Sequence, residues 1–407
     1  MILFLVSLLA VADAIHAPDS HSLRGCPQYW TPAESDCWVG DVVLGTFDGR
    51  VHVFYLKDRH HHMSAEGMGC HFFAHLSATT TLTDWMEHPD AVPLTEWWQT
   101  LGTGTPFVKD GKLCLAYGYH SERVDNWKEL KLPAGATWAE SDDAVHFRPT
   151  GVIFHETRNP TVYNRPDGRF GMILGYGGMG GMFASDDLLK WEPVDEKLPG
   201  RGDCPCYFTW NGHHYLVQGF TQMFHSASGN PGTWEDWGRP GDDIYEGLSV
   251  PMVCEVVGGR RLMAGWLRHP KGWGGWLVFR ELKQEADGKL ALCWPTGLST
   301  PVARPDIHRF DANSDGIISY RTVQGHKKLK LVIDAKTKTA AWTSGKERKD
   351  PYFADDFVIR NVQGLDRPYV VKVSVWYDER HDVTIFDAEI AGRRTLITRR
   401  YGRYEKD

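Results

Sequence analysis

The chain has 407 residues and a formal net charge of −7, with 42 glycines and 17 tryptophans. The acidic balance and the lack of a basic stripe exclude nucleic acid as an expected partner. The chain is too long for one ordinary core, so we predict two domains. A propeller is the exception, because it forms one large domain.

The first segment of the chain has the character of a targeting sequence. Residues 1–10 form an apolar run, and Ala12-Asp13-Ala14 and Ile15-His16-Ala17 both have the small-x-small form that signal peptidase accepts. The apolar run is too short to span a bilayer of about 30 Å. We therefore expect residues 1–17 to be a signal peptide, the mature protein to be secreted or periplasmic, and no membrane span to remain in it.

A tight turn followed by an alternating apolar strand recurs five times along the chain. Such Asp-Gly, Asn-Gly and Gly-Gly pairs predict hairpins, because the turn needs positive φ, which glycine adopts without steric cost. The turn glycines recur about every 44–62 residues, the length of a four-stranded sheet with its connections. This period favours an all-β, five-bladed β-propeller over residues 25–300 rather than a β-sandwich, whose strands recur without a longer period. The five turns are Asp48-Gly49, Asp110-Gly111, Asp167-Gly168, Asn211-Gly212 and Gly258-Gly259.

A second repeated signal follows the first three hairpins. Polar Ser, Thr and Asp residues lead into an aromatic residue in segments 77–85, 141–147 and 185–191. We predict that each is the turn joining the two outer strands of a blade.

Beyond Pro301 the propeller period disappears. Short alternating strands at 327–334, 369–376, 383–388 and 394–399 predict a C-terminal β-sandwich over residues 301–407. Residues 311–319 spell most of a calcium loop, but position 12 is Thr322 where the EF-hand requires glutamate, so we expect a turn there.

Polar residues stand where the first strands of the predicted blades begin, and these strands line the axis of a propeller. Asp41, Asn159 and Asp203 are the carboxylates or amides at three of the five starts. Two carboxylates brought together from opposed blades are what glycosidic bond cleavage requires.

An ordered set of motifs between about residues 35 and 300 resembles glycoside hydrolase family 32 and its family 43 relatives. The motifs are Trp38-x-x-Asp41, His52-x-Phe54-Tyr55, Phe73-Ala74-His75-x-Ser77 with Trp85, Gly102-Thr103-Gly104-Thr105, Arg158-Asn159-Pro160, Asp203-Cys204-Pro205, Tyr245 before Ser249, Gly259-Arg260-Arg261-Leu262-x-x-Gly265-Trp266, and Arg280-Glu281-Leu282.

The resemblance implies a role for three residues. It makes Asp41 the nucleophile and puts Asp203 at the position of the family's general acid/base glutamate. It puts Asn159 at the position of an aspartate that holds the sugar hydroxyls in the transition state. Asn159 keeps the size of aspartate but lacks its charge, and Asp203 is one methylene shorter than glutamate. Both departures are expected to alter rate or substrate.

Further predicted substrate-binding residues are Trp38, His75, Arg158, Tyr245 and Glu246, with Asn159. Glu246 is also the reserve carboxylate that would replace Asp203 as acid. Flat faces of Trp38, Trp97, Trp98, Trp273 and Trp276 are candidates for stacking on sugar rings. His60, His61 and His62 are consecutive and lack a carboxylate or cysteine at ligand spacing, so we predict no metal site and no cofactor. We expect these residues to form a loop that is solvated or lies at the rim of the funnel, the opening at the propeller axis.

Together these patterns predict an exported glycosidase that cleaves a furanosidic, fructan-like linkage in an oligo- or polysaccharide. Two alternatives remain: a glycan-binding propeller that has lost catalysis, which the Asn159 departure supports, and an inverting arabinosidase or xylosidase like those of family 43.

Overall fold

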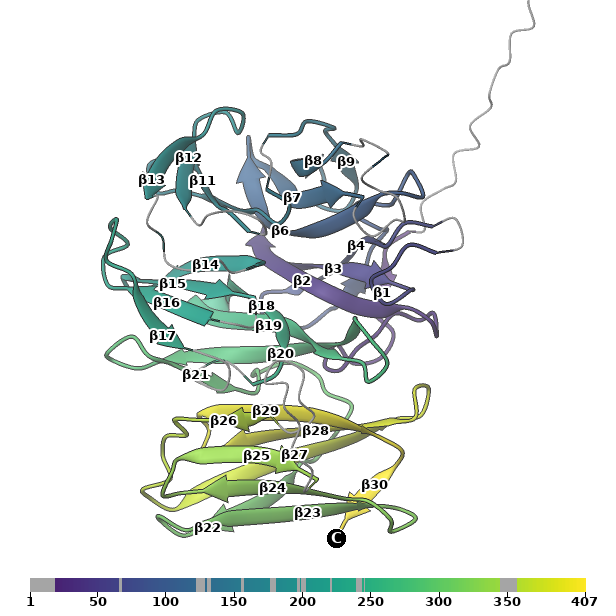
Figure 1. Cartoon of the computed structure of the whole chain (residues 1–407), viewed down its shortest axis with the longest axis vertical. Helices are drawn as coiled ribbons and strands as arrows, with labels where there is room; N and C mark the ends of the chain where they lie inside the picture. Colours follow the sequence, from purple (N-terminus) through teal and green to yellow (C-terminus); the bar gives the residue numbers. More distant parts are fainter. Residues whose placement is uncertain are drawn as a thin grey trace, which may run out of the picture.

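The structure is a computed structural model (Figure 1) that describes residues 19–65, 68–121, 129, 133–154, 157–175, 181–195, 198, 203–219, 222–238, 244, 246–344 and 357–407. The predicted signal peptide and Tyr245 lie outside the described residues. Among the described residues, no helix is long and apolar enough to cross a membrane.

Nearly all regular structure is antiparallel β-sheet, and the first 300 residues contribute four sheets. Three have four strands each, and in every one the strands follow chain order. They are β6 (Thr100–Lys109), β7 (Lys112–His120), β8 (Gly135–Ser141) and β9 (Phe147–Pro149); β10 (Thr161–Asn164), β11 (Phe170–Ile173), β12 (Met182–Ser185) and β13 (Glu192–Asp195); and β14 (Pro205–Trp210), β15 (His213–Gln218), β16 (Gln222–Ser226) and β17 (Glu235–Gly238).

The fourth sheet has nine strands and consists of two such groups. They join where Val39 of β2 pairs with Gly275 of β20. One group is β1 (His21–Ser22), β2 (Trp38–Phe47), β3 (Arg50–Asp58), β4 (His71–Thr79) and β5 (Met86–Glu87); the other is β18 (Ser249–Val256), β19 (Arg260–Arg268), β20 (Gly275–Gln284) and β21 (Leu290–Cys293), with the 3-10 turn η1 (Val257–Gly259) between β18 and β19.

The first strands of these groups meet one another around a common centre. β2 contacts β6, β6 contacts β10, β10 contacts β14, β14 contacts β18, and β18 contacts β2. The ring of contacts closes, as the first strands of a β-propeller do. The first strands of all five groups therefore surround one place in the molecule.

All five glycine turns predicted from the sequence connect the first and second strands of a group, so the predicted hairpins are confirmed. At four of them both turn residues have positive φ, for example 46° and 72° at Asp48 and Gly49. This backbone is the one that matches the twist of the flanking strands in a two-residue hairpin.

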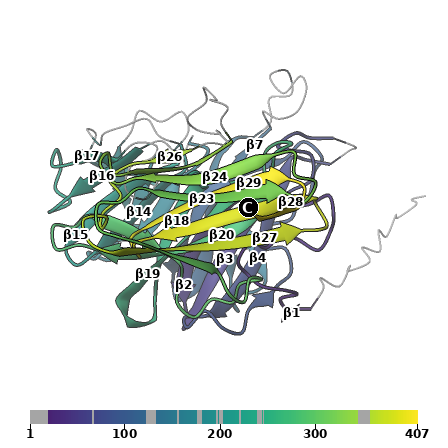
Figure 2. The same ribbon diagram turned by 90° about the horizontal axis from the view of Figure 1, so that it is seen from below.

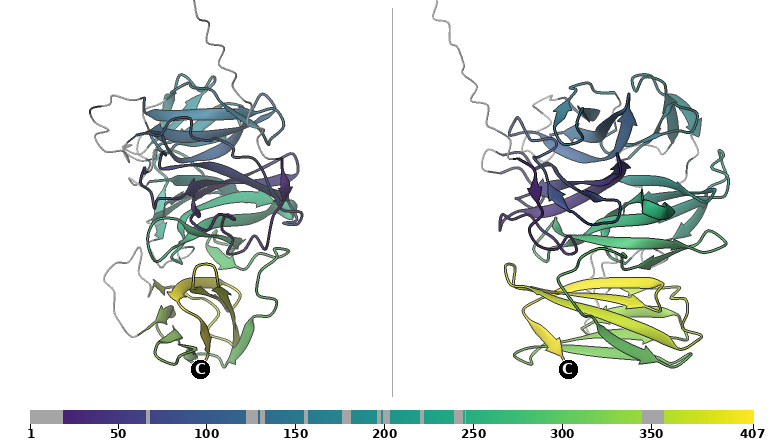
Figure 3. Two further views of the ribbon diagram at one scale, coloured as in Figure 1. Left: turned by 90° about the vertical axis from the view of Figure 1, so that its right-hand side faces the viewer. Right: turned by 180° about the vertical axis from the view of Figure 1, so that it is seen from behind.

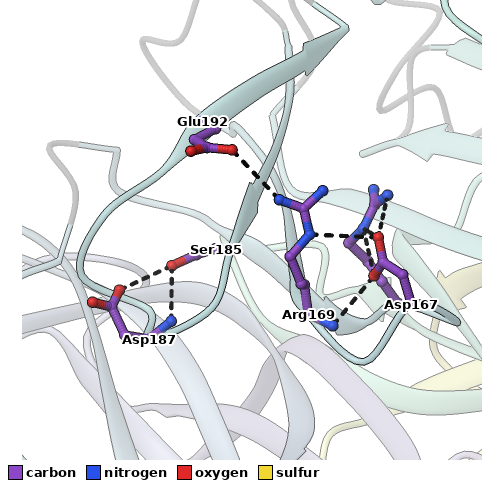
Figure 4. A network of polar contacts seen from close by, with 6 residues as sticks. Asp167, Arg169, Ser185, Asp187 and Glu192 are labelled. Carbon is purple, nitrogen blue, oxygen red and sulfur yellow. Dashed lines mark hydrogen bonds and ion pairs between the residues drawn. The ribbon is translucent and has the colours of Figure 1, made fainter.

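The predicted outer turns are confirmed as well. Ser185 donates to Asp187 (Figure 4). The Asp187 carboxylate also accepts the backbone N–H groups of Leu189 and Lys190. Asp143 accepts the N–H groups of Val145 and His146 in the same way after β8. A short carboxylate thus satisfies the backbone of the turn between the two outer strands.

Residues 306–406 form two further antiparallel sheets, which lie below the propeller in Figure 1 and in both views of Figure 3. Phe386 of one sheet contacts Tyr320 and Trp342 of the other, with ring centroids 5.3 and 5.4 Å away. The sheets are β22 (Asp306–Phe310), β27 (Tyr369–Asp378), β28 (Val383–Ile390) and β29 (Arg394–Tyr401), and β23 (Gly316–Thr322), β24 (Lys328–Asp334), β25 (Thr339–Thr343), β26 (Val358–Ile359) and β30 (Tyr404–Lys406). Residues 311–315 form the expected turn between β22 and β23.

The propeller and the C-terminal sheets share a buried polar contact beneath β20. The Arg280 guanidinium donates to both Glu246 oxygens at 2.6 and 3.0 Å and to Asp387 of β28 at 2.9 Å. All three side chains are fully buried. Seen from below in Figure 2, the C-terminal strands lie across this part of the propeller.

Candidate active site

A cavity of about 280 Å³ opens at the centre of the ring of first strands. Strands far apart in the sequence line it, because each first strand begins at the axis. Its walls are Asp41, Leu56, His62, His71, Gly102, Thr103, His120, Arg158, Asn159, Asp203, Cys204, Gly219, Ser249, Val250, Trp266 and Trp273.

Asp41 is the buried carboxylate of this pocket. The indole N–H of Trp266 donates to its Oδ1 at 3.1 Å, while the Thr103 hydroxyl and, at 3.7 Å, the Cys204 thiol donate to its Oδ2. Burial, together with the negative charge of Asp203, raises the pKa of Asp41 to about 6, although the three donors oppose the shift. Both oxygens are therefore fixed in direction by the protein.

Irregular backbone explains how side chains of extended strands reach the pocket. The pairing register shifts between Val39 and Val42 in β2, and again between Gly102 and Gly104 in β6. A bulge of this kind adds a residue on one strand and redirects its side chain. The side chains of Asp41 and Thr103, which lie within these shifts, consequently meet.

Two further residues at the pocket have a backbone that side chains seldom adopt. Cys204, just before β14, has φ of +49°, and Val250 in β18 has φ of +46°. Positive φ is unfavourable above all for a β-branched residue such as valine. Strain of this kind is concentrated at functional sites, where the surrounding structure holds it in place.

Asp203 lies at the exposed side of the same pocket and is bound to Asn159. The Asn159 amide Nδ2 donates to Asp203 Oδ1 at 2.6 Å and lies 3.6 Å from the Cys204 sulfur. The backbone N–H of Cys204 also donates to Asp203 Oδ1, at 2.9 Å. Asp203 thus has a neutral donor beside it where a second carboxylate would stand if residue 159 were aspartate.

Trp273 covers one side of the pocket from the turn between β19 and β20. A Cβ at Gly40 would lie 2.0 Å from the Trp273 ring, so only glycine allows the indole to lie against β2 beside Asp41. The His62 and His71 rings pack against the same indole, with centroids 4.6 and 4.9 Å away.

The structure brings together four of the predicted site residues, Asp41, Arg158, Asn159 and Asp203, in one pocket. Trp38 does not join them: it is buried between His269 and His381, whose ring centroids lie 4.1 and 4.3 Å away.

Two other predictions place residues at the pocket that the structure puts elsewhere. His75 is fully buried between β3 and β5, stacked on Phe54 at 4.4 Å, and burial holds its pKa well below the usual value. Glu246, predicted as a substrate-binding residue and reserve acid, is wrong in that role. Its two oxygens are engaged by Arg280, and no part of it lines the pocket.

Of the tryptophans considered for sugar stacking, only Trp273 lines the pocket. Trp276 is fully buried and donates to Asp378 at 2.8 Å. Trp97 is half exposed on the surface.

Sequence reasoning overlooked the residues that hold Asp41. Thr103, Cys204 and Trp266 all stand within motifs quoted above, yet none received a role. The alternation of residues along each strand does not reveal their contacts with Asp41. Those contacts depend on bulges and on strands more than 60 residues apart.

Comparison with known families gives a direct match over this region. The family model of the glycosyl hydrolases family 32 N-terminal domain matches residues 40–247, which span Asp41, Asn159 and Asp203. The fold is that of a β-propeller glycosidase. The chain belongs to glycosyl hydrolase family 32.

Solved structures share the fold at low sequence identity. The Bombyx mori GH32 beta-fructofuranosidase BmSUC1 has a TM-score of 0.64 and 15% identity, covering 94% of this chain and 90% of its own. Fructan 1-exohydrolase IIa from Cichorium intybus has a TM-score of 0.66 and 12% identity, covering 93% and 92%.

A family 43 structure is also similar. The CoXyl43 beta-xylosidase/alpha-arabinofuranosidase from a compost microbial metagenome has a TM-score of 0.50 and 17% identity, and the match covers 65% of this chain and 97% of that one. No curated protein sequence matches the chain significantly.

Proposed function

We propose that this chain hydrolyses a terminal β-fructofuranosyl linkage, with Asp41 as nucleophile and Asp203 as general acid/base. The observation that carries the proposal is the position of Asp41: a carboxylate at the propeller axis, held by three donors and open to a pocket that Asp203 also lines. Family membership and the fold shared with fructofuranosidases support it.

In this mechanism an Asp41 oxygen attacks the anomeric carbon and the bond to the leaving oxygen breaks, while Asp203 gives that oxygen its proton. Water then attacks the glycosyl ester, Asp203 takes a proton from it, and Asp41 leaves as the free carboxylate. The donors of Thr103 and Trp266 orient the carboxylate before attack and receive its charge again at release.

The pocket volume favours attack at a chain end. A cavity of about 280 Å³ lies just below the range of about 300–1,000 Å³ typical of sites for drug-sized ligands. It suits a single sugar ring better than the middle of a polysaccharide. The expected product is therefore free fructose.

We also propose the domain architecture around this site. The closed ring of five first strands supports a five-bladed propeller over residues 25–300, and the two packed C-terminal sheets support a β-sandwich over residues 301–407. Export after removal of residues 1–17 is part of the proposal and rests on the sequence of that segment.

A second candidate function, glycan binding without turnover, is favoured by one observation. The Asn159 amide donates to Asp203 Oδ1 at 2.6 Å, and the backbone N–H of Cys204 donates to the same oxygen at 2.9 Å. That oxygen of the acid/base candidate is therefore already engaged by two donors of the protein.

Sugar release from a substrate panel tests both candidates. The purified chain should release fructose from sucrose, 1-kestose or inulin, and not pentose from aryl arabinofuranosides or xylosides. Binding of the same fructosides without release would support the glycan-binding candidate, and release of pentose alone would contradict the assignment of substrate.

A further inference from the structure

The strongest unassigned feature is a cluster of three metal-ligating side chains at the rim of the pocket. His62, Cys70 and His71 each offer one ligand atom, and these atoms all lie within 4.8 Å of one another. His71 Nε2 lies 2.8 Å from His62 Nδ1. Cys70 and His71 are buried, and His62 is half-buried.

The donor set is specific in its chemistry. Two imidazole nitrogens and a thiolate suit Zn²⁺ and similar thiolate-preferring metals, and are unsuited to Ca²⁺ or Mg²⁺, which take oxygen ligands. Zinc–nitrogen bonds of about 2.0–2.1 Å and zinc–sulfur bonds of about 2.3 Å set tetrahedral ligand separations of roughly 3.3–3.6 Å. The two imidazole nitrogens now lie closer together than that, so metal binding requires the His62 ring to turn away from His71.

The surroundings fix the positions of the ligands. The Asp58 carboxylate accepts the backbone N–H of His62 at 2.9 Å, and Asp58 pairs with His71 across strands β3 and β4. Asp58 is fully buried, and its second oxygen has no hydrogen-bond partner among the described residues. The Asp58 carboxyl group thus holds the backbone of one candidate ligand and pairs across the strands with another.

From this juxtaposition we propose that His62, Cys70 and His71 bind a Zn²⁺-type ion through three protein ligands. His62 and His71 both line the pocket that contains Asp41, so the fourth coordination position faces that pocket. Water or a sugar hydroxyl is the ligand expected there. Sequence reasoning rejected a metal because the three consecutive histidines lack a carboxylate or cysteine at ligand spacing. The structure instead brings one of them, His62, beside Cys70 and His71 at the start of β4.

Binding of Co²⁺ and Zn²⁺ to the reduced full-length chain tests this site. One Co²⁺ per chain should bind, with a thiolate-to-cobalt charge-transfer band, and Zn²⁺ should displace it. Cys70→Ser should abolish the band, while Cys114→Ser, at a buried thiol of β7, should keep it. A wild-type chain without the band, or a band that survives Cys70→Ser, would overturn the proposal.

A second pair of variants tests the site independently if Cys70→Ser does not fold. His62→Gln should weaken Co²⁺ binding by more than the roughly 10–100-fold typical for loss of an outer partner, because a direct ligand is removed. His60→Gln, in the same loop, should bind as the wild type does. Equal affinities in these two variants would contradict the site, and neither result depends on fructose release.

Discussion

At the scale of single residues, the unusual property of this site is that its nucleophile candidate is buried. Asp41 accepts from three side chains, and burial with the charge of Asp203 still raises its pKa to about 6. A nucleophile must be ionised to act. Because burial raises the pKa of Asp41, it narrows the pH range in which this carboxylate is ionised and can act as a nucleophile.

The raised pKa of Asp41 predicts how fructose release and stability depend on pH. As pH falls below about 6, kcat/KM for fructose release should drop about tenfold per unit, because protonated Asp41 cannot attack. The contribution of Asp41 to stability runs the other way: its folded pKa exceeds the unfolded value of 3.8, so unfolding free energy declines as pH rises from about 4 to 6. A kinetic midpoint near pH 4 would contradict the burial argument.

A second prediction concerns Asn159. Asn159→Asp would offer a charged acceptor to the sugar hydroxyls where the amide offers a neutral one, and it would remove the amide donor from Asp203 Oδ1. Fructose release at pH 7 should therefore rise several-fold.

The matched control for this substitution is Asn211→Asp, which adds the same charge in a hairpin turn where Asp48 and Asp110 are already tolerated. It should leave the rate unchanged. If Asn159→Asp lowers the rate while Asn211→Asp does not, Asn159 is adapted to its own substrate and the missing charge at residue 159 is not what limits turnover.

At the scale of elements, the site depends on close approaches between neighbouring sheets. A Cβ at Gly118 of β7 would lie 1.2 Å from the carbonyl oxygen of Arg158. Gly118→Ala should therefore push Arg158 and Asn159 out of the pocket and reduce kcat/KM by at least about a hundredfold, as small misplacements of substrate-positioning groups do.

Gly111→Ala is the comparison for that variant. Gly111 has open space around its Cα and only a φ of +74° as an obstacle, so the substitution should cost about 1–2 kcal/mol of stability and no activity. Equal kcat/KM in the two variants would show that the approach of β7 to Arg158 does not position the site.

The hairpins of the propeller were predictable because their cause is local: an Asp-Gly or Asn-Gly pair determines the turn, and alternation determines the strands. The bulges at Asp41 and Thr103 were not, because register shifts depend on the neighbouring strand. For the same reason Asp41, Asn159 and Asp203 could be placed at the axis from strand starts, whereas the contacts that orient them could not.

At the scale of the whole molecule, Arg280 couples the propeller to the C-terminal sheets. It lies between Glu246 and Asp387, and burial raises the pKa of Asp387 to about 6 despite the opposing charge of Arg280. Glu246 was misjudged from sequence because its partner lies on another strand of the propeller and the third member on β28. Glu246, which stands near a strand start in the sequence, is part of the buried contact between the propeller and the C-terminal sheets.

Arg280→Met should lower the free energy of unfolding in urea by about 3–5 kcal/mol, since it leaves two buried carboxylates without a counter-charge. Arg260→Met is the control, because the ion pair of Arg260 with Glu281 is partly exposed and should contribute about 1 kcal/mol or less. Adding Glu246→Gln and Asp387→Asn to Arg280→Met should restore part of the loss. Equal losses at Arg280 and Arg260 would contradict a coupling role.

The most direct test of the proposed hydrolysis is the rate of fructose release from sucrose and 1-kestose by Asp41→Asn beside the wild type. The fold should survive, because asparagine can still accept from Trp266 through its oxygen and donate to the Thr103 hydroxyl through its amide. We predict release by the wild type and a loss of more than about a thousandfold in the variant, with an unfolding transition no lower than that of the wild type. Wild-type rates in folded Asp41→Asn would contradict the assignment of the nucleophile and with it the proposed mechanism.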